Sequence, residues 1–576
     1  MNRRGSCVVL AVLSSVASAQ SHDGPRTHKP APTSAEISVA DVMTREYIIA
    51  DDSMEGRNTG RRGGLRSANY IAAELRRMGL EPAGDNGTYF QRIPWFAQRV
   101  DPANTLRIGT DAVSADDFVL VPRIGFAVQI GGQPFGRAFR GENIETVFGG
   151  VLGDSATVAP DAVRGKIVVF APSSATGGRG GGRGGFQFWQ RDNLRRYRDA
   201  RAIFVATLDL AAPQQLAQYR GTRETFDDST LTGDATPLSV ISITAAAAER
   251  IFGKPLATLS AGATGQRVSG SIRFVNEPTE APAYNVVGIL RGRDVKLRNT
   301  YVAVGAHHDH VGMGPVVDHD SIRAFNDVVR KLGGDAPQPR NVTEDQWTRI
   351  RAIIDSLHRL HGGPRPDSIF NGADDDGSGT VMALEIAEAL APAANRPARS
   401  VLFVFHTAEE KGLYGAQYYS DHPSVPRDSI IAQVNLDQMG RGDPEDDPPS
   451  GPNALVLIGS KRRSPEFGEL VERVNSRPEY GFRLDYAFDA PAEPSNGWCR
   501  SDHYMYARYG IPVVFFVSAV SYRDLHMVTD EPQYIAYDRM TRITRYARDF
   551  VTVVASLDHR PVTRQATPDP NARCVQ

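Results

Sequence analysis

The sequence predicts an α/β fold with a mostly parallel central sheet flanked by helices, and a β-rich segment inserted into it. Two stretches that differ in their pattern of apolar residues support this prediction. After Pro282, continuous apolar runs alternate with helical stretches, and the runs read NVVGIL, YVAVGA, VLFVF, IIAQVNL, ALVLIG and IPVVFFV. Apolar strands separated by helices indicate a sheet covered on both faces. From about Pro94 to residue 280, short alternating runs broken by glycine predict short strands and tight turns instead.

The first 40 residues carry an export signal and a leader. MNRRGSCVVLAVLSSVASAQ places a basic pair before an apolar stretch from Cys7 to Ala17, which ends in a small-x-small cleavage site, so residues 1–19 are expected to be a signal peptide. That stretch is too short to span a bilayer, and no other segment approaches about 20 apolar residues. We therefore expect a secreted or periplasmic product that does not span a membrane. Residues 20–40, rich in Pro, Ser and His, predict a disordered leader.

Helices are predicted on both sides of the β-rich segment. Ile71 and Leu75 fall on one face of a helix that Gly79 ends, and the last helix carries an apolar stripe that includes Ile543 and Phe550. Residues from about 316 to 366 interrupt the strand–helix alternation. Within them an amphipathic helix is expected to lie over the body, with the apolar positions Trp347, Ile350, Ile354, Leu357 and Leu360.

Composition excludes some function classes. The chain has 576 residues, a formal net charge of −2 and a pI near 6.7, which gives no reason to expect a nucleic acid or an anionic membrane as partner. GGRGGGRGG, from Gly177 to Gly185, predicts a surface loop, and RNA binding is disfavoured in an exported chain of negative charge. Cys499 and Cys574 could form one disulfide, and neither lies in a C-x-x-C motif that would favour a thiolate zinc site.

Acids and histidines gather where the predicted strands end. Glu409 and Glu410 follow the strand VLFVF, and two adjacent carboxylates repel each other unless a cation or a proton is near. Ligands of open α/β sheets bind at the carboxyl ends of strands, and histidine with carboxylate is a typical ligand set for zinc. The other residues that fit this pattern are His307 after YVAVGA, Asp375 in GADDDGSG, Asp437 after IIAQVNL, and His526 in YRDLHMVTD. The sequence therefore predicts a metal enzyme.

Neighbouring residues suggest how these groups divide their roles. The spacing His307-x-Asp309 fits a metal ligand whose second ring nitrogen is oriented by a carboxylate, whereas His308 and His310 are expected to point elsewhere. Of the two adjacent glutamates, one should bind metal and the other should take a proton from water.

The chain resembles the co-catalytic di-zinc aminopeptidases, a family that also contains glutamate carboxypeptidase-like enzymes. The matching pieces include GAHHDH, DSIFNGADDDGSG, HTAEEKGLYGAQYY, NLDQMG and RSDHYMYARYGIPVVFF. VRGKIVVF and ARAIFVA resemble an inserted protease-associated domain. The resemblance implies a zinc exopeptidase fold, with residues 41–104 and 281–560 in the peptidase domain, residues 105–280 in the insert, and residues 561–576 as a flexible tail.

By that resemblance, Asp375 would bridge two zinc ions, and the peptide bond after it would be cis. One ion would be completed by His307 and Asp437, and the other by Glu410 and His526. Glu409 would be the general base and Asp309 would orient His307. Asp376 takes a place usually held by Asn, which adds a negative charge beside the metals. Leu525 stands before His526 where many members have a carbonyl-polarising Tyr, and Tyr522 and His503 are the two candidates to replace it.

The expected function is an exported zinc aminopeptidase that removes N-terminal residues from peptides or proteins. A glutamate carboxypeptidase-like exopeptidase is the first alternative, and it would need arginines near the metals. A glutaminyl cyclase is disfavoured because such enzymes use one zinc. A non-catalytic binding protein of the transferrin-receptor kind is disfavoured because all five ligands and Glu409 are present. The RGD at 441–443 is expected to be a chance match, and the sequence assigns no oligomeric state.

Overall fold

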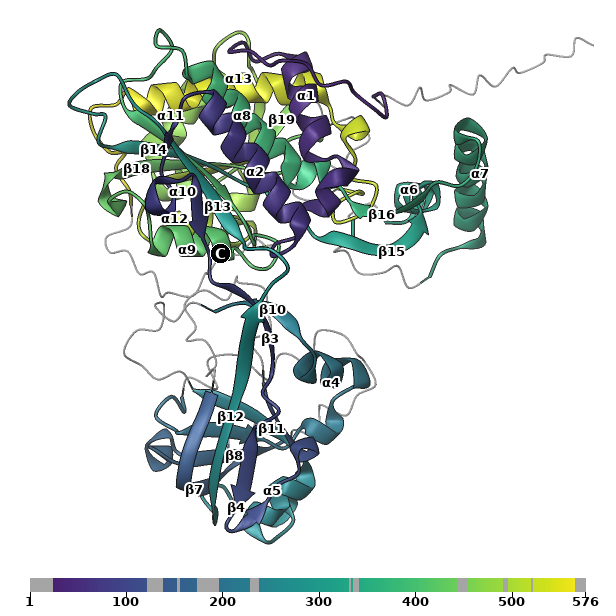
Figure 1. The fold of residues 1–576 in the computed structure, drawn as a ribbon, viewed down its shortest axis with the longest axis vertical. Coiled ribbons are helices and arrows are strands. Elements are labelled where there is room, and N and C mark those ends of the chain that lie inside the picture. Colours follow the sequence, from purple (N-terminus) through teal and green to yellow (C-terminus); the bar gives the residue numbers. More distant parts are fainter. Residues whose placement is uncertain are drawn as a thin grey trace, which may run out of the picture.

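The computed structural model describes residues 24–121, 138–152, 156–172, 196–227, 238–330, 333–334, 341–442, 453–490, 496–518 and 522–564. The expected signal peptide, the arginine-glycine loop, Cys574 and Asp443 lie outside these ranges. Figure 1 shows an α/β lobe, a β-rich lobe joined to it through long strands, and a small arm at the side of the first lobe. Among the described residues, none of the helices combines the length and the apolarity that a bilayer crossing requires.

The α/β lobe is built on a nine-stranded sheet with the order β1-β13-β17-β14-β18-β21-β19-β20, and β2 pairs with β13. β14, β17, β18 and β21 run parallel at its centre, whereas β13 and β19 join this group antiparallel. The expected α/β class is confirmed, with a mixed sheet whose centre is parallel. The strand bounds are β1 (Glu81–Pro82), β2 (Phe90–Arg92), β13 (Tyr284–Leu290), β14 (Tyr301–His307), β17 (Ser400–His406), β18 (Ile430–Leu436), β19 (Ala454–Ile458), β20 (Arg483–Asp485) and β21 (Val513–Val517).

Helices cover this sheet on both faces, which is why the central strands β14, β17, β18 and β21 are buried at every position. In β17, Phe403 packs into one hydrophobic core and its neighbour Val404 into the other. The first core includes side chains from α1 (Val39–Ile49), α2 (Arg62–Arg77), α8 (Gly379–Leu390), α11 (Pro465–Asn475) and α13 (Tyr537–Ala555). The second includes side chains from α9 (Tyr414–Asp421) and α12 (His503–Ala507), and α10 (Ser460–Arg463) precedes α11.

The β-rich lobe holds a ten-stranded sheet. Eight of its strands follow the order β10-β3-β12-β7-β8-β9-β11-β6, β4 pairs with β12, and β5 pairs with β4. β3 lies before residue 105, where the insert was expected to begin, and the division into domains stays a prediction. The bounds are β3 (Trp95–Val100), β4 (Thr105–Ile108), β5 (Asp111–Ala112), β6 (Phe118–Leu120), β7 (Ala138–Val151), β8 (Ile167–Ala171), β9 (Ala202–Val205), β10 (Arg223–Phe226), β11 (Ser239–Ile243) and β12 (Thr264–Pro278), with helices α4 (Pro213–Arg220) and α5 (Ala245–Phe252).

The arm contains β15 (Gly312–Asp318), α6 (His319–Val328), α7 (Glu344–His361) and β16 (Pro366–Phe370), and β15 pairs with β16. The expected amphipathic helix is α7, but its placement over the body was wrong. Figure 1 shows α7 projecting from the side of the lobe, packed against α6. Of the predicted apolar stripe only Ile350 is buried, and Leu360 is 72% exposed.

Candidate metal centre

The predicted ligands meet at one edge of the α/β sheet because the parallel strands end there. β14 ends at His307, which is level with His406 at the end of β17, and Asp437 follows directly after β18. Asp375 lies in the loop before α8, and its peptide bond to Asp376 is cis, as the family resemblance implies. His526 comes from the loop that follows β21. The rule that ligands collect at the carboxyl ends of strands thus describes this arrangement.

Asp375 lies between two imidazoles and presents one carboxylate oxygen to each. Its Oδ1 is 3.1 Å from His307 Nε2, and its Oδ2 is 3.0 Å from His526 Nε2. On the first side, Asp437 Oδ1 lies 3.6 Å from His307 Nε2. On the second side, Glu410 Oε2 lies 3.0 Å from His526 Nε2. Asp375 can therefore serve two adjacent donor groups at the same time.

The donor set fits two metal ions. Three buried or nearly buried carboxylates face three imidazoles, and the nitrogens and oxygens of this set are ligands that zinc accepts. Asp437 Oδ1 is buried without a hydrogen-bond partner, an arrangement that costs free energy unless a cation takes up the oxygen. The groups whose ligand atoms lie close enough together to hold an ion are His307, Asp375 and Asp437, and His310, Asp375 and Glu410.

Glu409 and Glu410 have different surroundings although they are adjacent. Burial and Asp375 raise the pKa of Glu410, but His526 and His310 outweigh them and hold that pKa well below its usual range. The nearest imidazole nitrogen to Glu409, His307 Nε2, is 3.9 Å away. Burial raises the pKa of Glu409 well above its ordinary value, against the lowering effect of His307. The pKa values of the two adjacent glutamates are thus shifted in opposite directions.

The two histidines expected to point elsewhere behave differently. His308 does turn away, because its ring nitrogens lie 3.2 Å from Ser67 Oγ and 2.9 Å from the carbonyl oxygen of Tyr284. His310 does not: its Nδ1 is 2.6 Å from Glu410 Oε1, so the expectation was wrong for this residue. β14 ends at His307, and strand alternation therefore gives no guide to the residues that follow.

Asp309 supports His307 and the glutamate loop together. His307 Nδ1 is 3.1 Å from the carbonyl oxygen of Asp309 and 3.7 Å from its carboxylate, so the ring directs Nε2 towards Asp375. The other contacts of the Asp309 carboxylate are with the backbone N–H of Glu409, which donates at 3.1 Å, and with the hydroxyl of Thr59, which donates at 2.9 Å. Thr59 comes from the N-terminal segment, where no residue pattern indicated a site.

Asp376 does not add its charge to the cleft. Its carboxylate accepts the backbone N–H groups of His307 and Gly379, each at 2.9 Å, and that of Gln438 at 3.3 Å. Burial raises the pKa of Asp376 well above its ordinary value. This residue therefore secures the backbone beneath the donor groups, and the expected charge beside the metals is directed away from them.

The two candidates for polarising the carbonyl are engaged elsewhere. The hydroxyl of Tyr522 is buried and donates to Asp530 at 3.1 Å. His503 is buried and stacks on Phe515 with 4.9 Å between ring centroids, and burial lowers its pKa to about 3. Neither side chain is presented to the donor groups in this structure.

Two buried arginines and one aspartate hold the Asp375 loop, and sequence patterns gave no signal for them. Asp530 accepts the backbone N–H groups of Asp374 and Asp375, each at 3.1 Å, and pairs with Arg441 at 2.8 Å. Arg57 donates to the carbonyl oxygens of Gly372 at 2.7 Å and of His308 at 3.0 Å. Because Arg441 is only 3% exposed and is paired with acids, it is not displayed as part of an adhesion motif.

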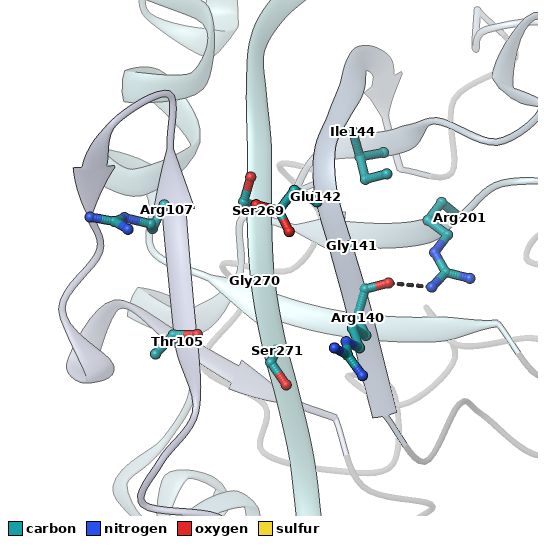
Figure 2. A pocket seen from close by; sticks show the side chains of 10 residues that line it. All are labelled: Thr105, Arg107, Arg140, Gly141, Glu142, Ile144, Arg201, Ser269, Gly270 and Ser271. Carbon is teal, nitrogen blue, oxygen red and sulfur yellow. Dashed lines mark hydrogen bonds between the residues drawn. The ribbon is translucent and has the colours of Figure 1, made fainter.

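A separate pocket of about 610 Å³ lies on the β-rich lobe and is open to solvent. Figure 2 shows Arg107, Arg140 and Arg201 at its walls, with Arg201 donating to the carbonyl oxygen of Arg140. None of the candidate ligands belongs to this pocket. The arginines that gather there are accordingly not placed to act at the metal centre.

Comparison with known proteins agrees with the geometry of the centre. Residues 285–551 match Peptidase family M28. The chain is 30% identical over 168 residues to Leupeptin-inactivating enzyme 1 of Streptomyces exfoliatus, covering 28% of this chain and 33% of the relative. It is 29% identical over 192 residues to Leucine aminopeptidase 1 of Coccidioides posadasii, covering 32% of this chain and 47% of the relative. The chain thus spans half or less of the length of these relatives.

A solved zinc aminopeptidase of Bacillus subtilis aligns with 91% of this chain and 96% of its own, at 16% identity and a TM-score of 0.41. The family match covers all the candidate ligands, from His307 to His526. The recognition made from the sequence motifs is confirmed: residues 285–551, which hold the candidate metal centre, match Peptidase family M28.

Proposed function

We propose that this chain is an exported zinc-dependent aminopeptidase that releases N-terminal residues from peptides. The observation that carries the proposal is the position of Asp375, which presents its two oxygens to two imidazoles at 3.1 and 3.0 Å with Glu409 beside them. The names of the matched relatives, several of them leucine aminopeptidases, support the same activity. Export rests on the expected signal peptide at residues 1–19.

Each residue of the centre has a proposed role. Asp375 would serve both metal sites, because one of its oxygens lies near His307 and the other near His526. His307 and Asp437 would complete one site, and Glu410 and His526, which lie 3.0 Å apart, would complete the other. His310 lies against Glu410 at 2.6 Å. When bound, two zinc ions would supply Lewis-acid charge that acidifies water and polarises the scissile carbonyl. Asp309 keeps Nε2 of His307 directed towards Asp375.

Glu409 is the proposed general base. It lacks the close imidazole contacts of Glu410, and its raised pKa means that it accepts a proton readily. It would take the proton of the attacking water and pass it to the leaving amine. Asp309 holds the backbone N–H of Glu409 and so fixes the position of this carboxylate.

Within the described ranges, the arginines beside the donor groups are not free to serve the carboxypeptidase alternative. Both arginines that contact the Asp374–Asp375 loop are already engaged: Arg57 with backbone carbonyls and Arg441 with Asp524 and Asp530. A substrate carboxylate would have to displace those partners. A free α-amine, in contrast, would meet the carboxylates of the donor groups.

The test is a matched pair of substrates that differ only at the amine. Aminoacyl chromogenic substrates with a free amine are compared with their N-acetylated forms, and both are compared with N-acetylated peptides that end in an acidic residue. We expect the free-amine substrates to be cleaved at least about a hundredfold faster, the rate equivalent of roughly 2.7 kcal/mol. Equal or faster cleavage of the acetylated acidic peptides would favour the carboxypeptidase instead.

A further inference from the structure

A second cluster of potential metal ligands lies in the arm, away from the M28 donor groups. Asp318 caps the N-terminus of α6 and Asp320 lies in its first turn, while His358 and His361 share one face near the end of α7. Asp318 Oδ2 is 2.9 Å from His358 Nε2, and Asp320 Oδ2 is 2.7 Å from His361 Nδ1. The ligand atoms of Asp318, Asp320 and His358 all lie within 4.8 Å of one another.

The chemistry of this cluster matches that of the candidate metal centre. In both places carboxylates meet imidazole nitrogens at about the separation of two ligands on one ion, 2.9 Å for His358 here and 3.0 Å for His526 there. Asp320 is fully buried, whereas the side chains of Asp318 and His358 are 22% and 26% exposed. An ion would therefore meet one buried carboxylate and two partly exposed ligands.

Other contacts orient the two aspartates for this role. Asp318 Oδ1 accepts the backbone N–H of Arg365 at 2.9 Å, and its Oδ2 accepts the backbone N–H and the hydroxyl of Ser321. The guanidinium of Arg365 lies 3.4 Å from Asp320 Oδ1. These partners fix both carboxylates while Oδ2 of each faces a histidine, as the outer hydrogen bonds of metal ligands do.

A neighbouring group of three potential ligands has fewer contacts between carboxylate and imidazole. His319, Asp367 and Glu531 also lie within reach of one another. There, Glu531 lies 3.2 Å from His319, and the guanidinium of Arg365 lies 3.5 Å from Glu531 as well as 3.4 Å from Asp320, so this cation does not distinguish the two groups. The cluster on α6 and α7 differs because each of its two aspartates presents Oδ2 to a histidine, at 2.9 and 2.7 Å.

The packing of α7 shows what a bound ion would stabilise. The helix has 18 residues and buries one apolar side chain, Ile350, so hydrophobic contact secures it weakly. The histidines lie near its C-terminal end, where a ligand bond would fix the helix to the first turn of α6. A bound ion contributes its binding free energy to the folded state.

We propose that Asp318, Asp320 and His358 bind one divalent ion of the zinc class, with His361 orienting Asp320. The ion ties the end of α7 to the start of α6. This site shares no ligand with the candidate metal centre, so the proposal for it does not depend on the proposed peptidase function.

Elemental analysis of the full chain, dialysed against limiting zinc, tests the proposal. Wild type should hold three zinc ions, His358→Ala two, and Asp375→Ala one. Asp318→Asn, which keeps an acceptor at the helix cap, should also hold two with an unchanged circular dichroism spectrum. His559→Ala is the control, because His559 touches Glu466 and Asp558 at 2.6 and 2.7 Å but belongs to no group of three ligands among the described residues.

Hydrogen exchange gives the second measurement. In His358→Ala, the amides in the last turns of α7 should exchange at least about tenfold faster than in wild type, while peptidase activity stays within about twofold. A wild type that holds two zinc ions, with the same content in His358→Ala and none in Asp375→Ala, would overturn the proposal. So would unchanged exchange in α7 when zinc is removed from wild type by a chelator.

Discussion

The pair Glu409 and Glu410 offers the sharpest test of the proposed mechanism, because two neighbouring glutamates should respond oppositely to the same substitution. Glu410 touches two imidazoles, with His310 Nδ1 at 2.6 Å and His526 Nε2 at 3.0 Å. Glu409 has one imidazole nitrogen at 3.9 Å. Replacing either residue with glutamine keeps the shape and removes the charge, so any difference reports the role of each carboxylate.

The expected sizes follow from these contacts. Glu409→Gln removes a proton acceptor and leaves the ligand groups intact, so kcat should fall by about 10²- to 10⁴-fold, equivalent to roughly 2.7–5.5 kcal/mol, with KM and zinc content unchanged. Glu410→Gln removes a carboxylate that is a proposed metal ligand, so the variant should hold one zinc fewer than wild type. Its activity should recover in part when excess zinc is added.

The assay combines elemental analysis with steady-state kinetics on a free-amine substrate, using Glu472→Gln as a surface control. Glu472 contacts Lys461 at the surface, and its loss should change neither measurement. The reasoning would be refuted by Glu409→Gln losing a zinc, or by its keeping kcat within tenfold of wild type. Reversed phenotypes would assign Glu409 to the metal and Glu410 to the proton.

Three further predictions concern the supporting residues. Asp530→Asn weakens the acceptor for the backbone N–H groups of Asp374 and Asp375. Zinc affinity at the candidate metal centre, measured by competition with a chelator, should therefore fall about 10- to 100-fold. An unchanged affinity would contradict this prediction. Arg57→Met leaves buried carbonyls unpaired and should lower the free energy of unfolding in urea by at least about 3 kcal/mol, whereas Arg61→Met, whose side chain is 52% exposed, should cost under about 1 kcal/mol. Burial lowers the pKa of His503 from 6.5 to about 3. Below pH 6.5 the imidazole therefore binds a proton in the unfolded state but stays neutral in the folded state, and the free energy of unfolding falls as the pH drops. His503→Phe should therefore reduce the loss of stability between pH 7.5 and pH 5 by about 2 kcal/mol, and an unchanged loss would contradict the buried neutral imidazole.

The strands and their ends were predictable because each carries a strong local signal. The six apolar runs all form strands, and His307 and Asp437 lie where the strand ends placed them. Side-chain directions beyond those ends were not predictable. His310 turns into the donor groups and His308 away from them, because the loop that follows β14 obeys no fixed period.

Long-range support was also invisible in the sequence. Arg57 reaches carbonyls more than 200 positions away, and its neighbours in the chain show no pattern that would reveal this contact. The arm gives the converse case. Periodicity correctly predicted α7 as an amphipathic helix. It indicates that one face of the helix packs against another element, but it does not identify that element. The partner is α6, and no local signal distinguishes α6 from the body of the lobe.

The direction of Asp376 changes where selectivity for a free amine has to arise. Had this carboxylate faced the cleft, it would have offered an acceptor for the amine that binds no metal. Instead it accepts backbone N–H groups from His307, Gly379 and Gln438. The acceptors that remain beside the substrate are the donor groups themselves. Mutating them would disturb metal binding and amine recognition together, so a protein variant cannot separate the two effects. Acetylation of the substrate removes the amine charge and leaves every ligand in place, and for that reason the substrate comparison decides between the two exopeptidase activities.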